Sequence, residues 1–157
     1  MSALKVFITG ASSGIGQALA EHYAKEGAII GLAARRQDLL NTLQDSLTTE
    51  TITYALDVRD AEALAGAAND FISRFGAPDI VIANAGVSAG TLTENRDDIK
   101  TFKGVIDINL LGMVHTFQPF IESMKQAGKG SLVGIASVAG IRGLPGAGAY
   151  SASKAAV

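Results

Sequence analysis

The sequence predicts an α/β fold, a doubly wound parallel sheet covered by helices in three α/β/α layers. Short apolar runs rich in β-branched residues alternate along the chain with longer segments of helical periodicity, the order expected of a parallel sheet with helices on both faces. The connections are short and rich in Gly, Asp and Pro, so no linker divides the chain. The 157 residues are therefore expected to form a single domain, residues 1–157.

Five strands and four helices follow from these patterns. Apolar, β-branched runs predict strands over residues 4–9, 29–33, 52–56, 80–83 and 131–136. Helical periodicity predicts helices over residues 15–26, 38–47, 61–75 and 100–125. Pro119 lies inside the last of these and is expected to bend the helix or to end it nearby.

Composition excludes several function classes. The net charge of −2 offers no basic stripe for nucleic acid. No apolar run is long enough to span a membrane and no signal-peptide layout follows Met1, so we expect a cytoplasmic protein without a membrane partner. The lack of cysteine excludes disulfides and thiolate chemistry. His22 and His115 lie outside any metal-ligand spacing, so no metal site is expected.

A glycine-rich turn separates the first strand from the first helix. It reads Thr9-Gly-Ala-Ser-Ser-Gly-Ile-Gly16, and its spacing differs from the general dinucleotide fingerprint Gly-x-Gly-x-x-Gly. Glycines permit a tight turn and a close approach of the backbone to a ligand, while free N–H groups at the helix start attract a pyrophosphate. We therefore favour a Rossmann-like dinucleotide-binding turn over a purely structural one. The residues expected to contact a cofactor here are Gly10, Ser12, Ser13, Gly14, Ile15 and Gly16.

Two arginines, Arg35 and Arg36, follow the second strand. A dinucleotide site ordinarily carries an acidic residue there to bind the ribose 2′-hydroxyl of NAD, whereas the 2′-phosphate of NADP calls for cationic donors. A guanidinium suits phosphate through its charge and its planar fork. The pair therefore favours NADP(H) over NAD(H), against the alternative of two solvated arginines that lead into a helix.

Polar and small residues end the third and fourth strands, at the sheet edge where ligands of open α/β folds bind. Asp57, which precedes Val58, is equally compatible with accepting a hydrogen bond from an adenine amino group and with stabilising the turn before the next helix. In Asn84-Ala85-Gly86 the small residues would let a flat ligand lie close, and Asn84 is equally compatible with a purely turn-stabilising role.

Tyr150 and Lys154 are the most informative pair in the chain. Four residues apart on a helix they project from the same face, so an ammonium can sit beside a phenol and favour its phenolate form. Asn109 is a polar residue in an otherwise apolar helical stretch, which requires a partner. Ser137 ends the fifth strand, and its hydroxyl is suited to hold a substrate carbonyl oxygen while Tyr150 donates the proton. Each residue alone has a structural explanation, but the four together predict a catalytic centre.

In these motifs the chain closely resembles the classical branch of the short-chain dehydrogenase/reductase (SDR) family. The matching motifs span the whole chain: the glycine turn 9–16, Asp57, Asn84-Ala-Gly86, Asn109, Ser137 and Tyr150-x-x-x-Lys154. The resemblance implies hydride transfer between a nicotinamide cofactor and a small carbonyl or alcohol substrate, with Tyr150 as general acid and base. It also implies that Lys154 contacts the nicotinamide ribose, that Ser137 polarises the substrate oxygen, and that Asn109 holds a water that links Lys154 to a proton relay.

Two other functions are compatible with the same motifs. One is an SDR-like nucleotide-binding protein without redox turnover, against which the retention of all four catalytic residues argues. The other is a dehydratase or epimerase that uses the same Tyr-Lys pair with bound cofactor, against which the glycine spacing argues. For the complete protein the family resemblance implies a homodimer or a homotetramer.

The chain departs from the family pattern in three ways. Ala83 stands where many members have a first asparagine, and Ser13 stands where NADP-preferring members often have a basic residue. Members are also usually longer, so we expect the last strands and helices to be absent and the chain to be a piece truncated at its carboxyl end. In the family's strand order 3-2-1-4-5-6-7, segment 131–136 would then be an exposed apolar edge. A helix that starts near Tyr150 would be too short to hold itself, so Lys154 is expected to be poorly fixed and the fragment inactive.

Overall fold

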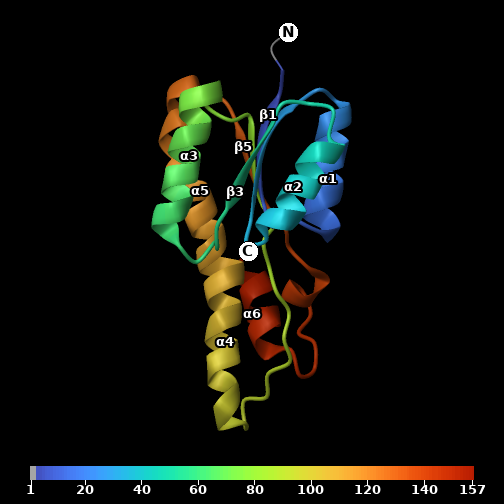
Figure 1. Ribbon diagram of the computed structural model, residues 1–157. Helices are drawn as coiled ribbons and strands as arrows, with labels where there is room; N and C mark the ends of the chain where they lie inside the picture. Colours follow the sequence, from blue (N-terminus) through green and yellow to red (C-terminus); the bar gives the residue numbers. More distant parts are fainter. Residues whose placement is uncertain (1–2) are drawn as a thin grey trace.

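The computed structural model describes residues 3–157 and contains a parallel sheet of five strands (Figure 1). The strands are β1 (Lys5–Thr9), β2 (Ile29–Ala34), β3 (Thr51–Ala55), β4 (Ile80–Ala83) and β5 (Ser131–Gly134). They lie in the order β3-β2-β1-β4-β5, and every neighbouring pair is parallel. This topology confirms the predicted doubly wound α/β fold. The strand order reverses beside β1, which is where open α/β sheets form their ligand crevice.

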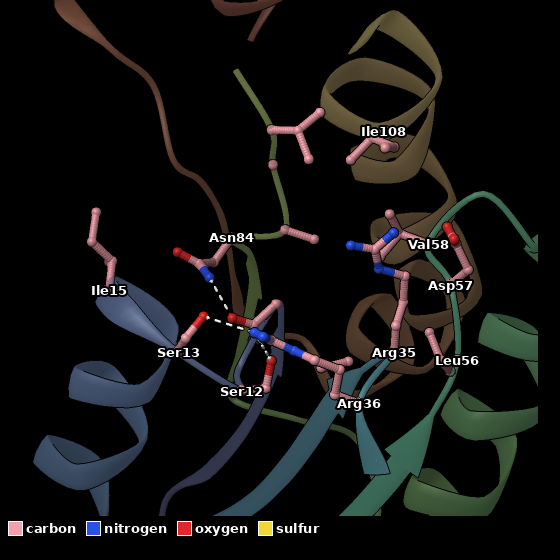
Figure 2. A pocket seen from close by; sticks show the side chains of 15 residues that line it. Ser12, Ser13, Ile15, Arg35, Arg36, Leu56, Asp57, Val58, Asn84 and Ile108 are labelled. Atoms are coloured by element: carbon pink, nitrogen blue, oxygen red, sulfur yellow. Dashed lines mark hydrogen bonds between the residues drawn. The ribbon is translucent and has the colours of Figure 1, made fainter. Parts of the chain in front are cut away.

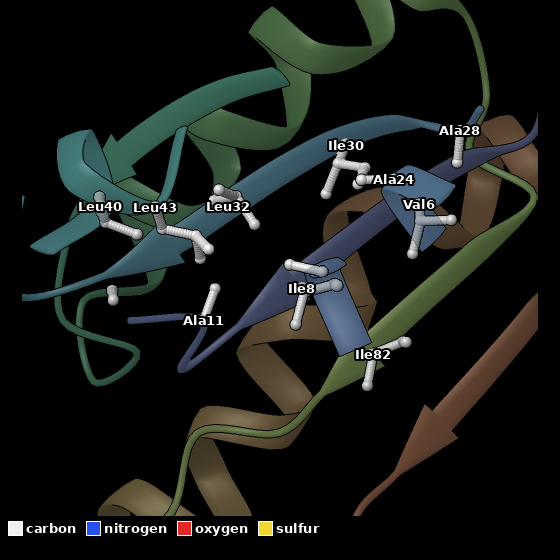
Figure 3. Packing of buried hydrophobic residues seen from close by; sticks show 12 residues of the cluster. Val6, Ile8, Ala11, Ala24, Ala28, Ile30, Leu32, Leu40, Leu43 and Ile82 are labelled. Carbon is white, nitrogen blue, oxygen red and sulfur yellow. The ribbon is translucent and has the colours of Figure 1, made fainter. Parts of the chain in front are cut away.

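Helices cover both faces of the sheet (Figure 1). The covering helices are α1 (Gly14–Lys25) and α2 (Gln37–Ser46) on one face and α3 (Ala61–Phe75) and α5 (Gly112–Ala127) on the other. Helices α4 (Ile99–Ile106) and α6 (Gly148–Ala156) lie side by side beyond the carboxyl ends of the strands. Successive side chains of β1 point to opposite faces of the sheet and so pack against different helices. Val6 and Ile8 pack in the core that α1 and α2 cover (Figure 3), whereas Phe7 faces α3 and α5. Among the helices described within residues 3–157, none is long and apolar enough to cross a membrane.

The helix predicted over residues 100–125 is in fact divided. A π-helical segment, Asp107–Leu111, separates α4 from α5, and Asn109 lies within it. The Asn109 side chain bonds to the backbone of Val87 in the loop after β4, so the polar group of this buried residue is satisfied. Insertions of this kind are frequent at functional sites.

Pro119 lies inside α5, and the helix continues past it to Ala127. Pro119 was expected to bend the helix or to end it nearby, and it does not end the helix. The neighbouring Phe120 is fully buried, with its ring centre 4.8 Å from that of Phe7. Packing of this face against the sheet holds the helix together despite the backbone hydrogen bond that proline removes.

Strand β5 lies at one edge of the sheet, beside β4. Its apolar side chains are open, with Leu132 43% and Val133 37% exposed. The expectation of an exposed apolar edge is confirmed, although the strand ends at Gly134 rather than at residue 136.

Candidate active site

A cavity of about 300 Å³ lies at the carboxyl ends of β1, β2 and β4 and beside the turn that follows β3 (Figure 2). It occupies the point where the strand order reverses. The predicted cofactor-binding residues that line it are Gly10, Ser12, Ser13, Ile15, Arg35, Arg36, Asp57, Val58, Asn84, Ala85 and Gly86. The other four predicted residues lie outside its lining: Gly14, Gly16, Tyr150 and Lys154.

Four further residues line the cavity that the sequence motifs do not indicate: Ala34, Leu56, Val87 and Ile108. Ala34 and Leu56 directly precede Arg35 and Asp57, so their position at the carboxyl edge of the sheet was a usable signal. Ile108 comes from the π-helical segment, far along the chain, and only the tertiary structure brings it to the cavity.

The glycine turn is pressed against the end of β4. Gly10 has a φ of 66°, and a Cβ there would lie 2.7 Å from Ala85 Cα, closer than van der Waals contact allows. Asn84 also joins the end of β4 to the glycine turn, because its Nδ2 donates to the carbonyl oxygens of Thr9 and Gly10 at 3.1 and 3.0 Å. Gly16 lies so close to Asn84 that a Cβ there would be 2.5 Å from Nδ2. Asn84 therefore performs the turn-stabilising role while it also lines the cavity.

The start of α1 and the Arg36 guanidinium lie together at one wall of this cavity. Ser13 occupies the N-cap position of α1, and within residues 3–157 its side chain makes no capping hydrogen bond, so the first-turn N–H groups can bind another acceptor. Arg36 Nη2 donates to both Ser12 Oγ and Ser13 Oγ at 3.3 Å (Figure 2). Free amides, two hydroxyls and a guanidinium at one wall form an arrangement suited to phosphate.

Asp57 is paired with Arg59 rather than left free. Arg59 Nη2 and Nε donate to the two carboxylate oxygens at 2.6 and 3.0 Å, and the Arg59 backbone N–H donates to Oδ1 as well. These contacts, chiefly the side-chain hydrogen bond from Arg59, lower the pKa of Asp57, with a smaller contribution from the charge of Arg35. The carboxylate thus stabilises the turn that leads into α3, and it also lines the cavity.

Lys154 is buried and held in place. It is only 9% exposed, its Nζ donates to the carbonyl oxygen of Ile135 at 2.6 Å, and it lies 5.9 Å from the centre of the Tyr150 ring. The expectation that Lys154 is poorly fixed is therefore wrong. The nine residues of α6 are fewer than an isolated helix needs, but α6 packs against α4 and the short 3-10 helix Val138–Gly140, and tertiary contacts replace intrinsic helix stability.

Asn109 joins three segments through its side chain. It is 2% exposed, and its Oδ1 accepts from the Val87 N–H at 2.8 Å. Its Nδ2 donates to the Val87 carbonyl oxygen at 2.9 Å and to Ser153 Oγ at 3.0 Å. Ser153 Oγ in turn donates to the Tyr150 carbonyl oxygen at 2.7 Å. The π-helical segment, the loop after β4 and α6 are thus connected by one continuous chain of hydrogen bonds.

Gly86 connects the cavity to these side chains. It lines the cavity, and a Cβ placed on it would lie 3.3 Å from Asn109 Oδ1 and 3.7 Å from Lys154 Nζ. Lys154 and Asn109 therefore stand at the Gly86 end of the cavity, although Lys154 itself lies outside the lining.

Ser137 stands at the start of the 3-10 helix Val138–Gly140, where its Oγ accepts from the Ala139 N–H at 3.2 Å. This short helix packs on α6: Gly140 lies so close to the backbone of Lys154 and Ala155 that a side chain at Gly140 would collide with it. Ser137 is thereby brought to the helix that carries Tyr150, and its own hydroxyl proton is not used in the capping bond.

Comparison with known proteins finds similarity along the whole chain. The family model described as short chain dehydrogenase matches residues 4–157. An uncharacterized oxidoreductase of Myxococcus xanthus is 39% identical over 158 residues, which cover 99% of this chain and 62% of the relative. A 2-dehydro-3-deoxy-L-rhamnonate dehydrogenase (NAD(+)) of a Sphingomonas species is 39% identical over 150 residues, which cover 96% of this chain and 60% of the relative.

Among solved structures, an alcohol dehydrogenase from the archaeon Thermococcus sibiricus, complexed with 5-hydroxy-NADP, is similar with a TM-score of 0.92 at 33% identity. That comparison covers 99% of this chain and 67% of the archaeal chain. The chain thus spans only about three fifths of the two curated relatives, 62% and 60% of their lengths. The names of these proteins include both NAD(+) and an NADP derivative, so similarity alone does not select between the two cofactors.

Proposed function

Because the chain belongs to the short-chain dehydrogenase family, we propose that the complete protein is an NADP-dependent oxidoreductase acting on a small carbonyl or alcohol substrate. One observation carries the proposal. The buried ammonium of Lys154 lies beside the Tyr150 ring and near Gly86, at the end of a cavity whose other wall is the glycine turn. A cofactor that extends along this cavity would bring its far end to the Tyr150 side chain.

Tyr150 is the proton donor and acceptor of the proposed reaction. In reduction the nicotinamide supplies a hydride to the carbonyl carbon, and in oxidation it takes a hydride back. The Tyr150 hydroxyl gives its proton to the carbonyl oxygen in the first direction and recovers it from the alcohol in the second. Lys154, whose Nζ lies 5.9 Å from the centre of the Tyr150 ring, is assigned the contact with the nicotinamide ribose that the family resemblance implies.

Ser137 and Asn109 have supporting roles in this proposal. The Ser137 hydroxyl accepts from the Ala139 N–H, which leaves its own proton free to be donated to the substrate oxygen and to polarise the carbonyl. Both amide hydrogens of Asn109 are used, by Val87 and Ser153, but its Oδ1 accepts only one hydrogen bond among the described residues. The second lone pair of that oxygen is suited to hold the relay water that the family resemblance implies.

The preference for NADP rests on the arginines. Arg36 reaches the hydroxyls of Ser12 and Ser13 beside the start of α1, so its guanidinium stands next to free amides. A phosphate there would replace two neutral acceptors of the Arg36 guanidinium with a charged acceptor, so that both partners of each hydrogen bond would be ionised and the bond stronger. A basic residue in the glycine turn is unnecessary in this arrangement, because Arg36 extends to the position of Ser13 from the turn between β2 and α2.

The test is the variant Tyr150→Phe in the complete protein, with Tyr23→Phe as the matched control. Tyr23 belongs to the packed side of α1, away from the cavity. NADPH-dependent reduction is measured across a panel of carbonyl compounds, and cofactor binding is measured by fluorescence. We expect Tyr150→Phe to lower kcat by a factor on the order of 100 to 10,000, the usual range for a general acid, while cofactor binding is kept.

An unchanged kcat in Tyr150→Phe would defeat the mechanism. Cofactor binding without turnover of any carbonyl or alcohol in the unmodified protein would instead favour a nucleotide-binding protein without redox chemistry. Substrate conversion without net consumption of NADPH would favour a dehydratase or an epimerase.

A further inference from the structure

Helix α6, which carries Tyr150 and Lys154, begins without a cap of its own. Its N-cap residue is Ala147, which has no side-chain acceptor and makes no capping hydrogen bond. The first N–H groups of a helix have no partner within the helix, and alanine is among the poorest N-cap residues. In α6 the N–H groups that lack a partner within the helix lie one turn or less from Tyr150.

The missing acceptor comes from Thr91, in the loop between β4 and α4. Thr91 is a polar residue only 7% exposed, and its Oγ1 accepts a hydrogen bond from the Ala149 N–H at 3.3 Å. Its own backbone N–H donates to the Gly146 carbonyl oxygen at 2.8 Å, and it forms an isolated parallel bridge with Ala147. Thr91 is therefore fixed by backbone pairing in the position where its hydroxyl meets the first turn of α6.

The same loop contacts α6 directly at Gly86 and is linked to it a second time through Asn109 of the π-helical segment. Gly86 lies against Lys154, and Val87 binds Asn109, which holds Ser153. Figure 1 shows this loop descending from β4 beside α6 before it enters α4. The direct contact at Gly86 and the indirect link through Asn109 both act on the carboxyl-terminal half of α6, whereas the Thr91 side chain holds its first turn.

We propose that Thr91 is a positioning residue that sets the place of Tyr150 by capping α6 from outside the helix. Without the Thr91 hydroxyl the Ala149 N–H, directly before Tyr150, is left unsatisfied in a buried position, and the first turn of α6 opens. Tyr150 then loses its alignment with Lys154, whose own side chain is still held by Ile135. The catalytic meaning of this role rests on the proposed function, whereas its structural meaning does not.

The test compares Thr91→Val, which removes the hydroxyl and keeps the shape, with Thr91→Ser, which restores the hydroxyl. Thr93→Val is the matched control, because Thr93 is an exposed threonine of the same loop. The first readout is amide hydrogen exchange of Ala149 and the first turn of α6 in the complete protein. We expect Thr91→Val to speed this exchange about two- to thirty-fold, the range for a lost N-cap, and Thr91→Ser to return it toward the unmodified rate.

The second readout separates positioning from general destabilisation. Thr91→Val is expected to lower kcat while the dissociation constant of the cofactor stays near its original value, because the cavity residues are untouched. Thr93→Val is expected to change neither. Unchanged exchange at Ala149 in Thr91→Val, or an equal loss of kcat in Thr93→Val, would overturn the proposal. Faster exchange in a protein that has no turnover in any form would support the capping role and contradict the proposed function instead.

Discussion

Gly10→Ala is the substitution for which the structure predicts the most distinctive outcome, and Gly27→Ala is its matched control. Both glycines have a left-handed backbone, with φ of 66° and 72°. They differ in their surroundings. A Cβ at Gly10 would lie 2.7 Å from Ala85 Cα and 2.8 Å from Ala85 N, whereas a Cβ at Gly27 would meet nothing within 4 Å.

The expected magnitude follows from this difference. A left-handed conformation costs a residue with a Cβ roughly 1–2 kcal/mol, and this cost is shared by both variants. Overpacking adds about 1–3 kcal/mol in Gly10→Ala alone, because the obstructing atoms are backbone that cannot rotate away. The free energy of unfolding should therefore fall by about 2–5 kcal/mol in Gly10→Ala, and by no more than about 2 kcal/mol in Gly27→Ala.

The assay is urea unfolding of the complete protein, combined with a titration of NADPH into each variant. Displacement of the loop after β4 should also disturb the contacts of Asn84 with the turn, so cofactor binding is expected to weaken in Gly10→Ala and to persist in Gly27→Ala. If Gly10→Ala is no less stable than Gly27→Ala and binds NADPH normally, the close packing of the turn against β4 is not what holds this wall of the cavity.

Three further outcomes are expected from the remaining contacts. Arg36→Ala should weaken NADPH binding about tenfold or more while NADH binding changes little, because one charged contact to phosphate is lost; equal effects on both cofactors would make Arg36 a surface group. Asn109→Ala should lower the free energy of unfolding by about 2–4 kcal/mol, as three hydrogen bonds are lost, against a negligible change in the exposed Asn69→Ala. The pKa of Asp57 is lower in the folded state, chiefly because of the side-chain hydrogen bond from Arg59, so the ionised carboxylate stabilises the fold at pH values above the ordinary carboxyl pKa. This contribution is lost as the pH falls through the pKa of Asp57 in the folded state. Arg59→Gln should therefore reduce stability in urea at pH 7, and the difference should shrink in acid; a constant difference would contradict the pairing.

Strands and helices were predictable because their signals are local. In β1 the alternation of Val6, Phe7 and Ile8 between the two faces requires only that successive side chains point in opposite directions. The glycine turn was predictable for the same reason, since its place between a strand and a helix is visible in a short stretch of sequence. Asn109 shows the limit of such signals. A polar residue in an apolar helix indicated that its side chain needs a hydrogen-bond partner. The partner is Val87, in a loop 22 residues earlier in the chain, and neither this bond nor the π-helical segment could be predicted locally.

Lys154 shows why a local estimate of stability was wrong. Judged by length, α6 is too short to persist, and Lys154 was expected to be loose. In the folded chain α6 rests on α4 and on the 3-10 helix after β5, and Thr91 and Asn109 bind it from the loop and from the π-helical segment. Contacts between segments distant in the sequence supply the stability that the helix lacks by itself.

The amino-acid sequence by itself determined the α/β fold, the family, and the residue types available for phosphate binding and proton transfer, because periodicity and motif spacing are properties of the chain. Only the tertiary structure decided how these residues are held: Arg36 at the glycine turn, Asp57 against Arg59, and Lys154 buried beside Tyr150. The physical reason is that a hydrogen bond acts over about 3 Å, so its partners are set by how the loops pack and not by their distance along the chain.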